Sequence, residues 1–142
     1  MQGLKSHFPI HIPNAADMVS FGEKIGPYFI RGDVIALVGQ LGAGKTHLAK
    51  GIAQSFNYEG AVTSPSYALI HEYSRTPLVH ADLYRMNRPE ELLEIGWDEY
   101  LDNDLVLIVE WADRFPQLMP EKTHWIKIQH RDRGRALEYA LH

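Results

Sequence analysis

The sequence predicts a three-layer α/β fold built on a mixed, mostly parallel central sheet, with an antiparallel hairpin at the C-terminal end. Short apolar runs rich in β-branched residues alternate with stretches of helical periodicity, which is typical of parallel sheets covered by helices. The segment HWIKIQHRDRGRALEYAL instead indicates two strands joined by a turn near Asp132 to Gly134. The length of 142 residues suits one domain, which we assign to residues 1–142.

The N-terminal half predicts a helix, a strand and a second helix. Asn14 is a favourable N-cap, and apolar residues at helical spacing follow it, so we expect a helix over residues 15–28. The run Val34–Val38 is apolar and rich in β-branched residues, as in a buried central strand. After a glycine-rich loop, one apolar face predicts the second helix: Leu48, Ala49, Ile52, Ala53 and Phe56.

The C-terminal half predicts three more strands and one interrupted helix before the hairpin. A strand is expected from Tyr67 onward, and the segments PLVHADLYR and DLVLIVEWAD, residues 77–85 and 104–113, predict two others. Residues 87–101 carry proline near the first turn and an apolar face, so they predict a helix, with a break at Gly96.

The composition indicates a cytoplasmic protein. The absence of cysteine excludes disulfides, cysteine zinc sites and a thiol nucleophile, and it fits a reducing compartment. The sequence contains no recognisable signal peptide and no run that approaches the length of a membrane span. The formal net charge of −4 gives no electrostatic reason for tight nucleic-acid binding by this chain alone. Four basic residues lie near the C-terminus: Lys127, Arg131, Arg133 and Arg135. We interpret them as solvated residues of a hairpin, and contact with an anion is the alternative.

The segment GQLGAGKT, residues 39–46, fits the phosphate-binding pattern G-x-x-x-x-G-K-[ST]. It lies between a predicted strand and a predicted helix, which is the context that a P-loop NTPase-like fold requires. We expect the backbone amides and the helix N-terminus to hold phosphates, Lys45 to reach the β- and γ-phosphates, and the Thr46 hydroxyl to bind Mg²⁺. The predicted nucleotide-binding residues of the loop are Gly39, Gln40, Leu41, Gly42, Ala43, Gly44, Lys45 and Thr46.

Two carboxylates, Asp82 and Glu110, come at the ends of predicted apolar strands. If both strands end at the same edge of the sheet, one carboxylate holds Mg²⁺ and the other orients the attacking water. The sequence does not divide these roles, and a solvated carboxylate is the alternative for each. With Lys45, they are the expected catalytic residues, and with Thr46, the expected metal ligands.

Three other features are left open or interpreted as structural. The hydroxyl-rich segment 63–66 is either a sensor of the γ-phosphate or a polar turn. Trp111 packs either over the site or in the core, and we favour the core. His80 is interpreted as structural, because no histidine in the chain has a recognised metal-ligand spacing.

The sequence favours an ATPase whose output is conformational. The segment between the two carboxylate strands holds only Arg85 and Arg88, whereas a small-molecule kinase usually has an arginine-bearing lid. The guanine-specific pattern [NT]-K-x-D is absent. A small-molecule or nucleoside kinase and a non-catalytic nucleotide-binding switch remain the alternatives.

The motifs GQLGAGKT, SPSY, HADLYR, RPEELLEIGWDEYL and IVEW occur in this order, and through them the chain resembles the TsaE (YjeE) family from about residue 14 to residue 135. The resemblance implies a P-loop α/β fold, binding of ATP and Mg²⁺, and weak ATP hydrolysis by the protein alone. It also implies two partner proteins, TsaB and TsaD, which form N6-threonylcarbamoyladenosine in tRNA while ATP hydrolysis resets their complex. Contact with tRNA would be indirect and membranes would not be involved, and we expect a monomer when the chain is alone.

The resemblance also assigns roles to individual residues. These roles are metal binding at Thr46 and Glu110, an acidic site residue at Asp82, and nucleotide contacts at Ala15 and Arg135. Two positions depart from the family pattern, namely Gln40, where an acidic residue is common, and His47, where threonine or serine is common. Neither is a phosphate-binding position of the motif, so ATP binding remains the expectation.

Overall fold

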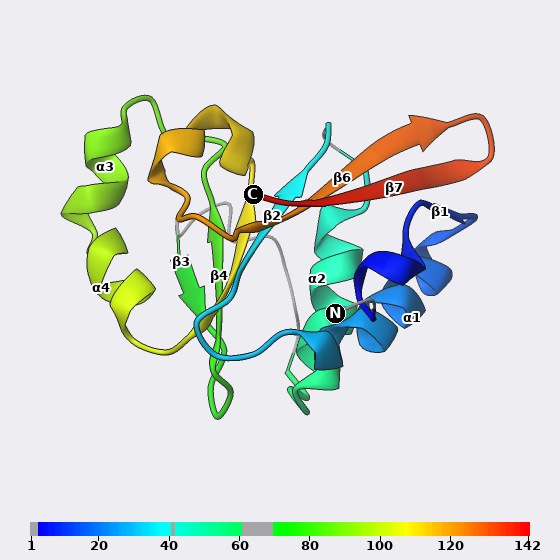
Figure 1. The fold of residues 1–142 in the computed structure, drawn as a ribbon, viewed down its shortest axis with the longest axis horizontal. Coiled ribbons are helices and arrows are strands. Elements are labelled where there is room, and N and C mark those ends of the chain that lie inside the picture. The colour runs from blue at the N-terminus through cyan, green and yellow to red at the C-terminus, as the bar shows by residue number, and fades with distance from the viewer. Residues whose placement is uncertain (1–2, 41, 61–69) are drawn as a thin grey trace.

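The computed structural model describes residues 3–40, 42–60 and 70–142 (Figure 1). Its strands form a seven-stranded sheet in the order β1-β7-β6-β2-β5-β4-β3. The strands are β1 (Ile10–Ile12), β2 (Val34–Val38), β3 (Ile70–Glu72), β4 (Leu78–Asp82), β5 (Val106–Glu110), β6 (His124–Arg131) and β7 (Gly134–Leu141). The four central strands β6, β2, β5 and β4 are parallel, and antiparallel pairings occur at both sides of them.

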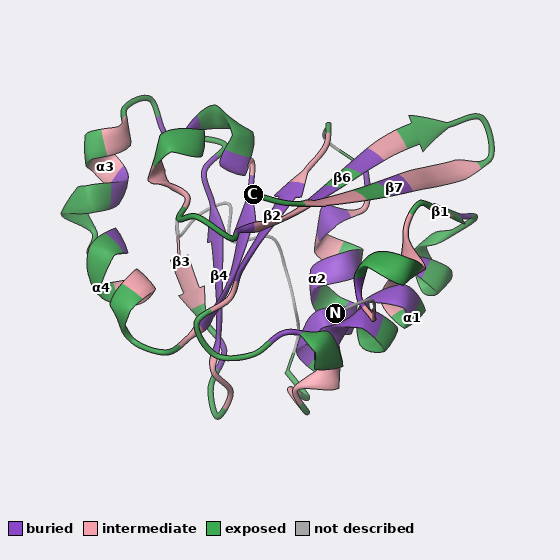
Figure 2. Cartoon of the chain, in the orientation of Figure 1, coloured by how far each residue is buried: buried purple, intermediate pink, exposed green. Residues whose placement is uncertain are grey.

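Helices cover both faces of this sheet, as the sequence predicts (Figure 1). The α-helices are α1 (Ala15–Ile25), α2 (Lys45–Ser55), α3 (Pro89–Glu94) and α4 (Trp97–Asp102). Four 3₁₀-helices are also described: η1 (Lys5–His7), η2 (Gly26–Tyr28), η3 (Ala112–Arg114) and η4 (Pro116–Leu118). Helices α1 and α2 enclose one apolar core against the sheet, and α3 and α4 enclose a second core on the other face. Strands β2, β4 and β5 are buried along almost their whole length, which fixes the positions of their ends (Figure 2).

Helix α2 is held close to α1 by two glycines that face each other. A Cβ atom on Gly51 would lie 2.0 Å from the backbone oxygen of Val19 and 2.8 Å from the Cα of Gly22. A Cβ atom on Gly22 would likewise lie 2.5 Å from the backbone oxygen of Leu48. Since only glycine permits this approach of two backbones, the pair sets the position of the helix that begins at Lys45.

Most predicted elements are present with small differences at their ends. The first helix continues beyond Ile25 as the 3₁₀-helix η2, and Gly96, at φ +92°, separates α3 from α4 as predicted. The hairpin turns between Arg131 and Gly134, also as predicted. Strand β1 was not predicted, because its three residues are too few to show a period, and it is held by pairing with β7.

The strand predicted from Tyr67 onward is described only from Ile70, where β3 begins. Its first residues, 67–69, lie outside the described parts of the chain. Within those parts, none of the helices has the length and apolar character that crossing a membrane would need.

Candidate functional site

The glycine-rich loop joins the carboxyl end of β2 to the first residue of α2. Gly44 is the N-cap of α2 at φ +109°, and a Cβ atom there would lie 3.0 Å from the Met18 side chain. The backbone conformation therefore favours glycine at this position, and a Cβ atom would also require a small shift of the Met18 methyl group. Residues Gly42 to Thr46, at the end of the loop and the start of α2, border a cavity of about 450 Å³. A helix N-terminus with exposed amides is a favourable place for a phosphate group.

Lys45 is almost completely buried, with 5% of its surface exposed, at the edge of this cavity. Its ammonium group donates hydrogen bonds to the backbone oxygens of Gly39 and Gln40, and the bond to Gln40 measures 3.1 Å. The same nitrogen lies 4.2 Å from the centre of the Trp111 ring, a cation–π contact.

Burial lowers the pKa of the Lys45 ammonium, while the carboxylates of Glu110 and then Asp82 act in the opposite direction. The site therefore holds a poorly hydrated cation. An incoming phosphate would stabilise this cation because it supplies negative charge at short range.

Asp82 and Glu110 meet at the same edge of the sheet, as the sequence predicts. They are register partners at the carboxyl ends of the parallel strands β4 and β5, and only 6% and 3% of their surfaces are exposed. Both line the 450 Å³ cavity together with Thr46 and Lys45. The backbone amide of Tyr84 donates a 2.9 Å hydrogen bond to Oδ1 of Asp82, which helps to fix that carboxylate.

The oxygen donors Thr46, Asp82 and Glu110 fit Mg²⁺ better than a metal that needs a closed protein cage. Within residues 3–40, 42–60 and 70–142, no group of three or more His, Cys, Asp or Glu side chains is placed to hold a metal ion. Mg²⁺ commonly uses one or two carboxylates and completes its shell with water and phosphate oxygens. A hydroxyl and two carboxylates beside the cavity of the glycine-rich loop correspond to this pattern.

His80 is buried and has hydrogen-bonding partners on both ring nitrogens. Its Nε2 lies 2.6 Å from Oε2 of Glu110, and its Nδ1 lies 2.7 Å from the Tyr73 hydroxyl. This agrees with the interpretation of His80 as structural, but it also connects the histidine to a predicted site residue. The sequence analysis did not predict this contact between His80 and Glu110. One signal was available, because His80 and Asp82 lie two residues apart on one strand and so share the face on which the site carboxylates were expected.

A second cavity, of about 250 Å³, adjoins the first across the loop and the start of α2. It is lined by Ala15 and Arg135, which the resemblance assigns to nucleotide binding, together with Met18 and His47. The guanidinium of Arg135 donates hydrogen bonds of 3.1 Å to the backbone oxygens of both Ala43 and Gly42. Arg135 is thus engaged with the loop. The other basic residues that we singled out on the hairpin are exposed: Lys127, Arg131 and Arg133.

Some predicted residues lie elsewhere or cannot be placed. Gly39 and Gln40 line a different hollow, beside β6, and contribute to the site through the carbonyl groups that hold Lys45. Leu41 and the segment 63–66 lie outside the described residues. Trp111, which we expected in the core, packs against the core behind α3 and α4 and also lines the 450 Å³ cavity.

The chain is a P-loop NTPase-like protein, as the sequence predicts. The features that define this class are the glycine-rich loop between a strand and a helix and the two carboxylates at neighbouring strand ends. The crystal structure of YdiB from Bacillus subtilis has this arrangement of elements, with a TM-score of 0.76 and 30% sequence identity. The match covers 91% of this chain and 82% of that structure.

The chain belongs to the TsaE family. The sequence model of that family, described as threonylcarbamoyl adenosine biosynthesis protein TsaE, matches residues 12–137. A Haemophilus influenzae protein named tRNA threonylcarbamoyladenosine biosynthesis protein TsaE is 33% identical over 135 residues, or 90% of this chain and 85% of that protein. A Treponema pallidum protein of the same name is 33% identical over 117 residues, or 82% of this chain and 87% of its own length. The resemblance inferred from the sequence motifs is therefore confirmed.

Proposed function

We propose that the protein is a Mg²⁺-dependent ATPase that acts as an accessory subunit in the formation of N6-threonylcarbamoyladenosine in tRNA. One observation carries the proposal: in a member of the TsaE family, Lys45, Thr46, Asp82 and Glu110 border a single cavity at the glycine-rich loop. The four side chains provide one cation for phosphate, one hydroxyl and two carboxylates for Mg²⁺ and water. These are the groups that phosphoryl transfer in this class of protein uses.

In this proposal the two adjoining cavities hold different parts of ATP. The phosphates occupy the larger cavity, where the loop amides and Lys45 meet them. The nucleoside occupies the smaller cavity between Ala15 and Arg135, because the two cavities share the loop residues Gly42 to Gly44. The smaller cavity is bounded by the apolar side chain of Met18, which suits the face of a base.

Bound Mg²⁺ would neutralise charge on the phosphates, and Thr46 with one or both carboxylates would hold it. The protein side chains supply the rest of the chemistry. Lys45 stabilises negative charge on the β- and γ-phosphates. A carboxylate that does not bind the metal accepts a hydrogen bond from the attacking water and so orients it. The burial of Asp82 and Glu110 keeps both carboxylates in fixed positions for these roles.

The expected activity of the isolated chain is low, and the expected partners are TsaB and TsaD. The names of the family and of the relatives support this step of the proposal, because both refer to threonylcarbamoyladenosine biosynthesis. ATP hydrolysis would reset the partner complex between turnovers, and the transfer to tRNA would take place on the partners.

The test is Mg²⁺-dependent release of phosphate from ATP, measured for the pure chain and then with TsaB and TsaD added. Weak turnover that rises in the complex supports the proposal. Strong turnover that ignores the partners, or ADP release that requires a small acceptor molecule, would favour a kinase or an independent ATPase. Tight ATP binding without turnover in the complex would favour a nucleotide-binding switch.

A further inference from the structure

A buried row of hydrogen bonds extends away from the phosphate cavity behind Glu110. Glu110 lines the cavity, His80 lies behind it at 2.6 Å, and Tyr73 follows at 2.7 Å. Only 3%, 0% and 1% of the surfaces of these three residues are exposed. They come from β5, from β4 and from the residue after β3, three neighbouring strands of the sheet. Their contacts are therefore held by the rigid part of the fold.

The chemistry of Tyr73 indicates how protons are arranged along this row. Burial raises the pKa of the Tyr73 phenol, so its hydroxyl keeps its proton and can donate to Nδ1 of His80. A neutral imidazole that accepts at Nδ1 carries its hydrogen on Nε2. That Nε2–H group then donates to Oε2 of Glu110.

The arrangement leaves no polar group of the row unpaired. Among the described residues, every buried side-chain nitrogen and oxygen has a hydrogen-bonding partner. A neutral histidine with one donor and one acceptor satisfies both neighbours when Tyr73 donates and Glu110 accepts. The opposite tautomer would place a lone pair of Nε2 against the carboxylate, which is repulsive.

We propose that His80 is a positioning residue for Glu110, and that Tyr73 supports this role by donating a hydrogen bond to Nδ1 of His80. The hydrogen bond to Oε2 holds the carboxylate, so that Oε1 is the oxygen presented to Mg²⁺ or to the attacking water. This inference rests on the proposed function for its catalytic meaning, whereas the tautomer and the hydrogen bond to Glu110 are properties of the protein without ATP.

Two substitutions separate positioning from simple packing. The side-chain amide of glutamine reaches about as far as Nε2 of histidine, so His80→Gln keeps a donor for Glu110. Asparagine is shorter and reaches only about as far as Nδ1, so His80→Asn keeps the Tyr73 contact and loses the donor. Tyr73→Phe removes one hydroxyl and leaves the ring in place. His130→Asn, at an exposed position on β6, is the matched control.

The first experiment is ¹⁵N NMR of the histidine rings of the protein without nucleotide, with the His80 signals identified by their loss in His80→Gln. We expect the Nε2–H tautomer in the wild type. In Tyr73→Phe we expect a changed ¹⁵N shift of Nδ1, because that nitrogen loses its hydrogen-bonding partner while Glu110 still favours hydrogen on Nε2. A wild-type His80 in the Nδ1–H form would overturn the proposal. This result does not depend on whether the protein hydrolyses ATP.

The second experiment compares ATP binding with and without Mg²⁺ by calorimetry, together with kcat and KM. Loss of an outer-shell partner commonly reduces metal affinity or activity by about 10- to 100-fold. For His80→Asn we expect a loss of this size in the Mg²⁺-dependent part of binding and in kcat, with metal-free binding unchanged. His80→Gln should recover most of this loss, and His130→Asn should show none of it.

Equal Mg²⁺ responses in His80→Asn and the wild type would overturn the positioning role. If the wild type shows no ATP hydrolysis, the proposed function fails, and the NMR tautomer and the calorimetric Mg²⁺ response still decide the role of His80. If His80→Asn does not fold, the tautomer of His80 in the wild type decides in its place, because the Nδ1–H form cannot donate to Glu110. An unchanged ¹⁵N shift of Nδ1 in Tyr73→Phe would contradict the role of Tyr73.

Discussion

Asp82 and Glu110 are register partners at the carboxyl ends of β4 and β5, and both are buried beside the cavity that the glycine-rich loop borders. Two carboxylates placed side by side repel each other and also repel an incoming phosphate. Lys45 is a cation near both of them, and its buried ammonium is shared with two loop carbonyls. If the proposed function is correct, we expect the site to bind ATP together with a divalent cation.

We therefore expect Asp82→Asn and Glu110→Gln to weaken the Mg²⁺-dependent part of ATP binding by about tenfold or more, the size seen even for outer-shell partners of metals. Metal-free ATP should bind equally well or more tightly, because a negative charge near the phosphates is removed. Calorimetric titrations with and without Mg²⁺ measure both effects. Asp98→Asn, at an exposed position on α4, is the control. If both site variants keep the wild-type Mg²⁺ response, neither carboxylate is a metal ligand.

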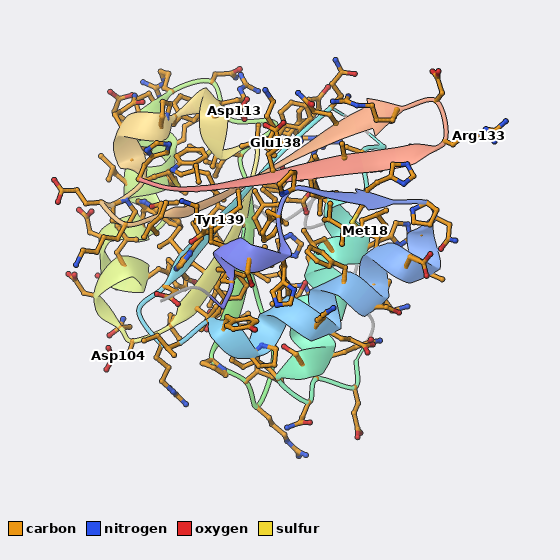
Figure 3. All side chains as sticks on the ribbon, turned by 45° about the vertical axis from the view of Figure 1, so that its right-hand side comes forward. Met18, Asp104, Asp113, Arg133, Glu138 and Tyr139 are labelled. Atoms are coloured by element: carbon orange, nitrogen blue, oxygen red, sulfur yellow. The ribbon has the colours of Figure 1, made fainter. Side chains whose placement is uncertain are left out.

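Arg135 connects the C-terminal hairpin to the loop through the backbone oxygens of Gly42 and Ala43. Arg135→Ala should lower ATP affinity by about two- to tenfold, which corresponds to the loss of about one hydrogen bond that stabilises the loop. Arg133 lies at the tip of the same hairpin and projects away from the protein (Figure 3), so Arg133→Ala is a control of equal charge change. Equal affinities of the two variants would show that the contact with the loop has no part in binding.

The approach of α1 and α2 predicts a stability effect at Gly51. A Cβ atom there would overlap the Val19 backbone oxygen, so Gly51→Ala must push the helices apart. Overpacking of this kind commonly costs about 1–3 kcal/mol of the free energy of unfolding. Gln54→Ala, at an exposed position of α2, should change it by less than about 0.5 kcal/mol. Urea denaturation measures both, and equal stabilities would contradict the proposed close contact.

The raised pKa of Tyr73 predicts a stability change in alkaline solution. The unfolded chain releases the phenol proton near the ordinary pKa of 10.0, whereas the folded chain keeps it to higher pH. In that range the folded state binds more protons, so the free energy of unfolding falls as the pH rises above 10. Tyr73→Phe should show a shallower fall, because Tyr100 and Tyr139 are present in both proteins and their contributions cancel. Urea denaturation at several alkaline pH values provides the test, and identical slopes would count against a buried, protonated Tyr73.

The central features of the site could be predicted because each depends on local sequence. The loop and its Lys45 follow from one motif, and the positions of Asp82 and Glu110 follow from apolar runs that end in a carboxylate. Parallel strands place such ends at the same edge of the sheet whatever their order, and the adjacency of β4 and β5 then brings these two side by side. The break at Gly96 and the turn before Gly134 likewise depend on local backbone preferences.

Other features depend on which strands become neighbours, and the sequence pattern does not determine this. The pairing of β6 with β2 and of β7 with β1 brings Arg135 to the loop. The family resemblance indicated Arg135 as a nucleotide contact, and nothing in the sequence indicated its contact with the loop backbone. The row from Tyr73 to Glu110 requires β3, β4 and β5 to be adjacent in the sheet. Trp111 reaches Lys45 because its backbone has a φ of +61°, a conformation that is uncommon for a large residue and has no local sequence signal.

The most direct test of the account is the calorimetric affinity for Mg²⁺-ATP of Lys45→Ala compared with Lys50→Ala, an exposed lysine on the same helix. A charge-assisted contact contributes about 1.5–3 kcal/mol, so Lys45→Ala should bind Mg²⁺-ATP about 10- to 150-fold more weakly than the wild type. Lys50→Ala should bind as the wild type does. Equal affinity in all three proteins would contradict the assignment of this cavity as the phosphate-binding site.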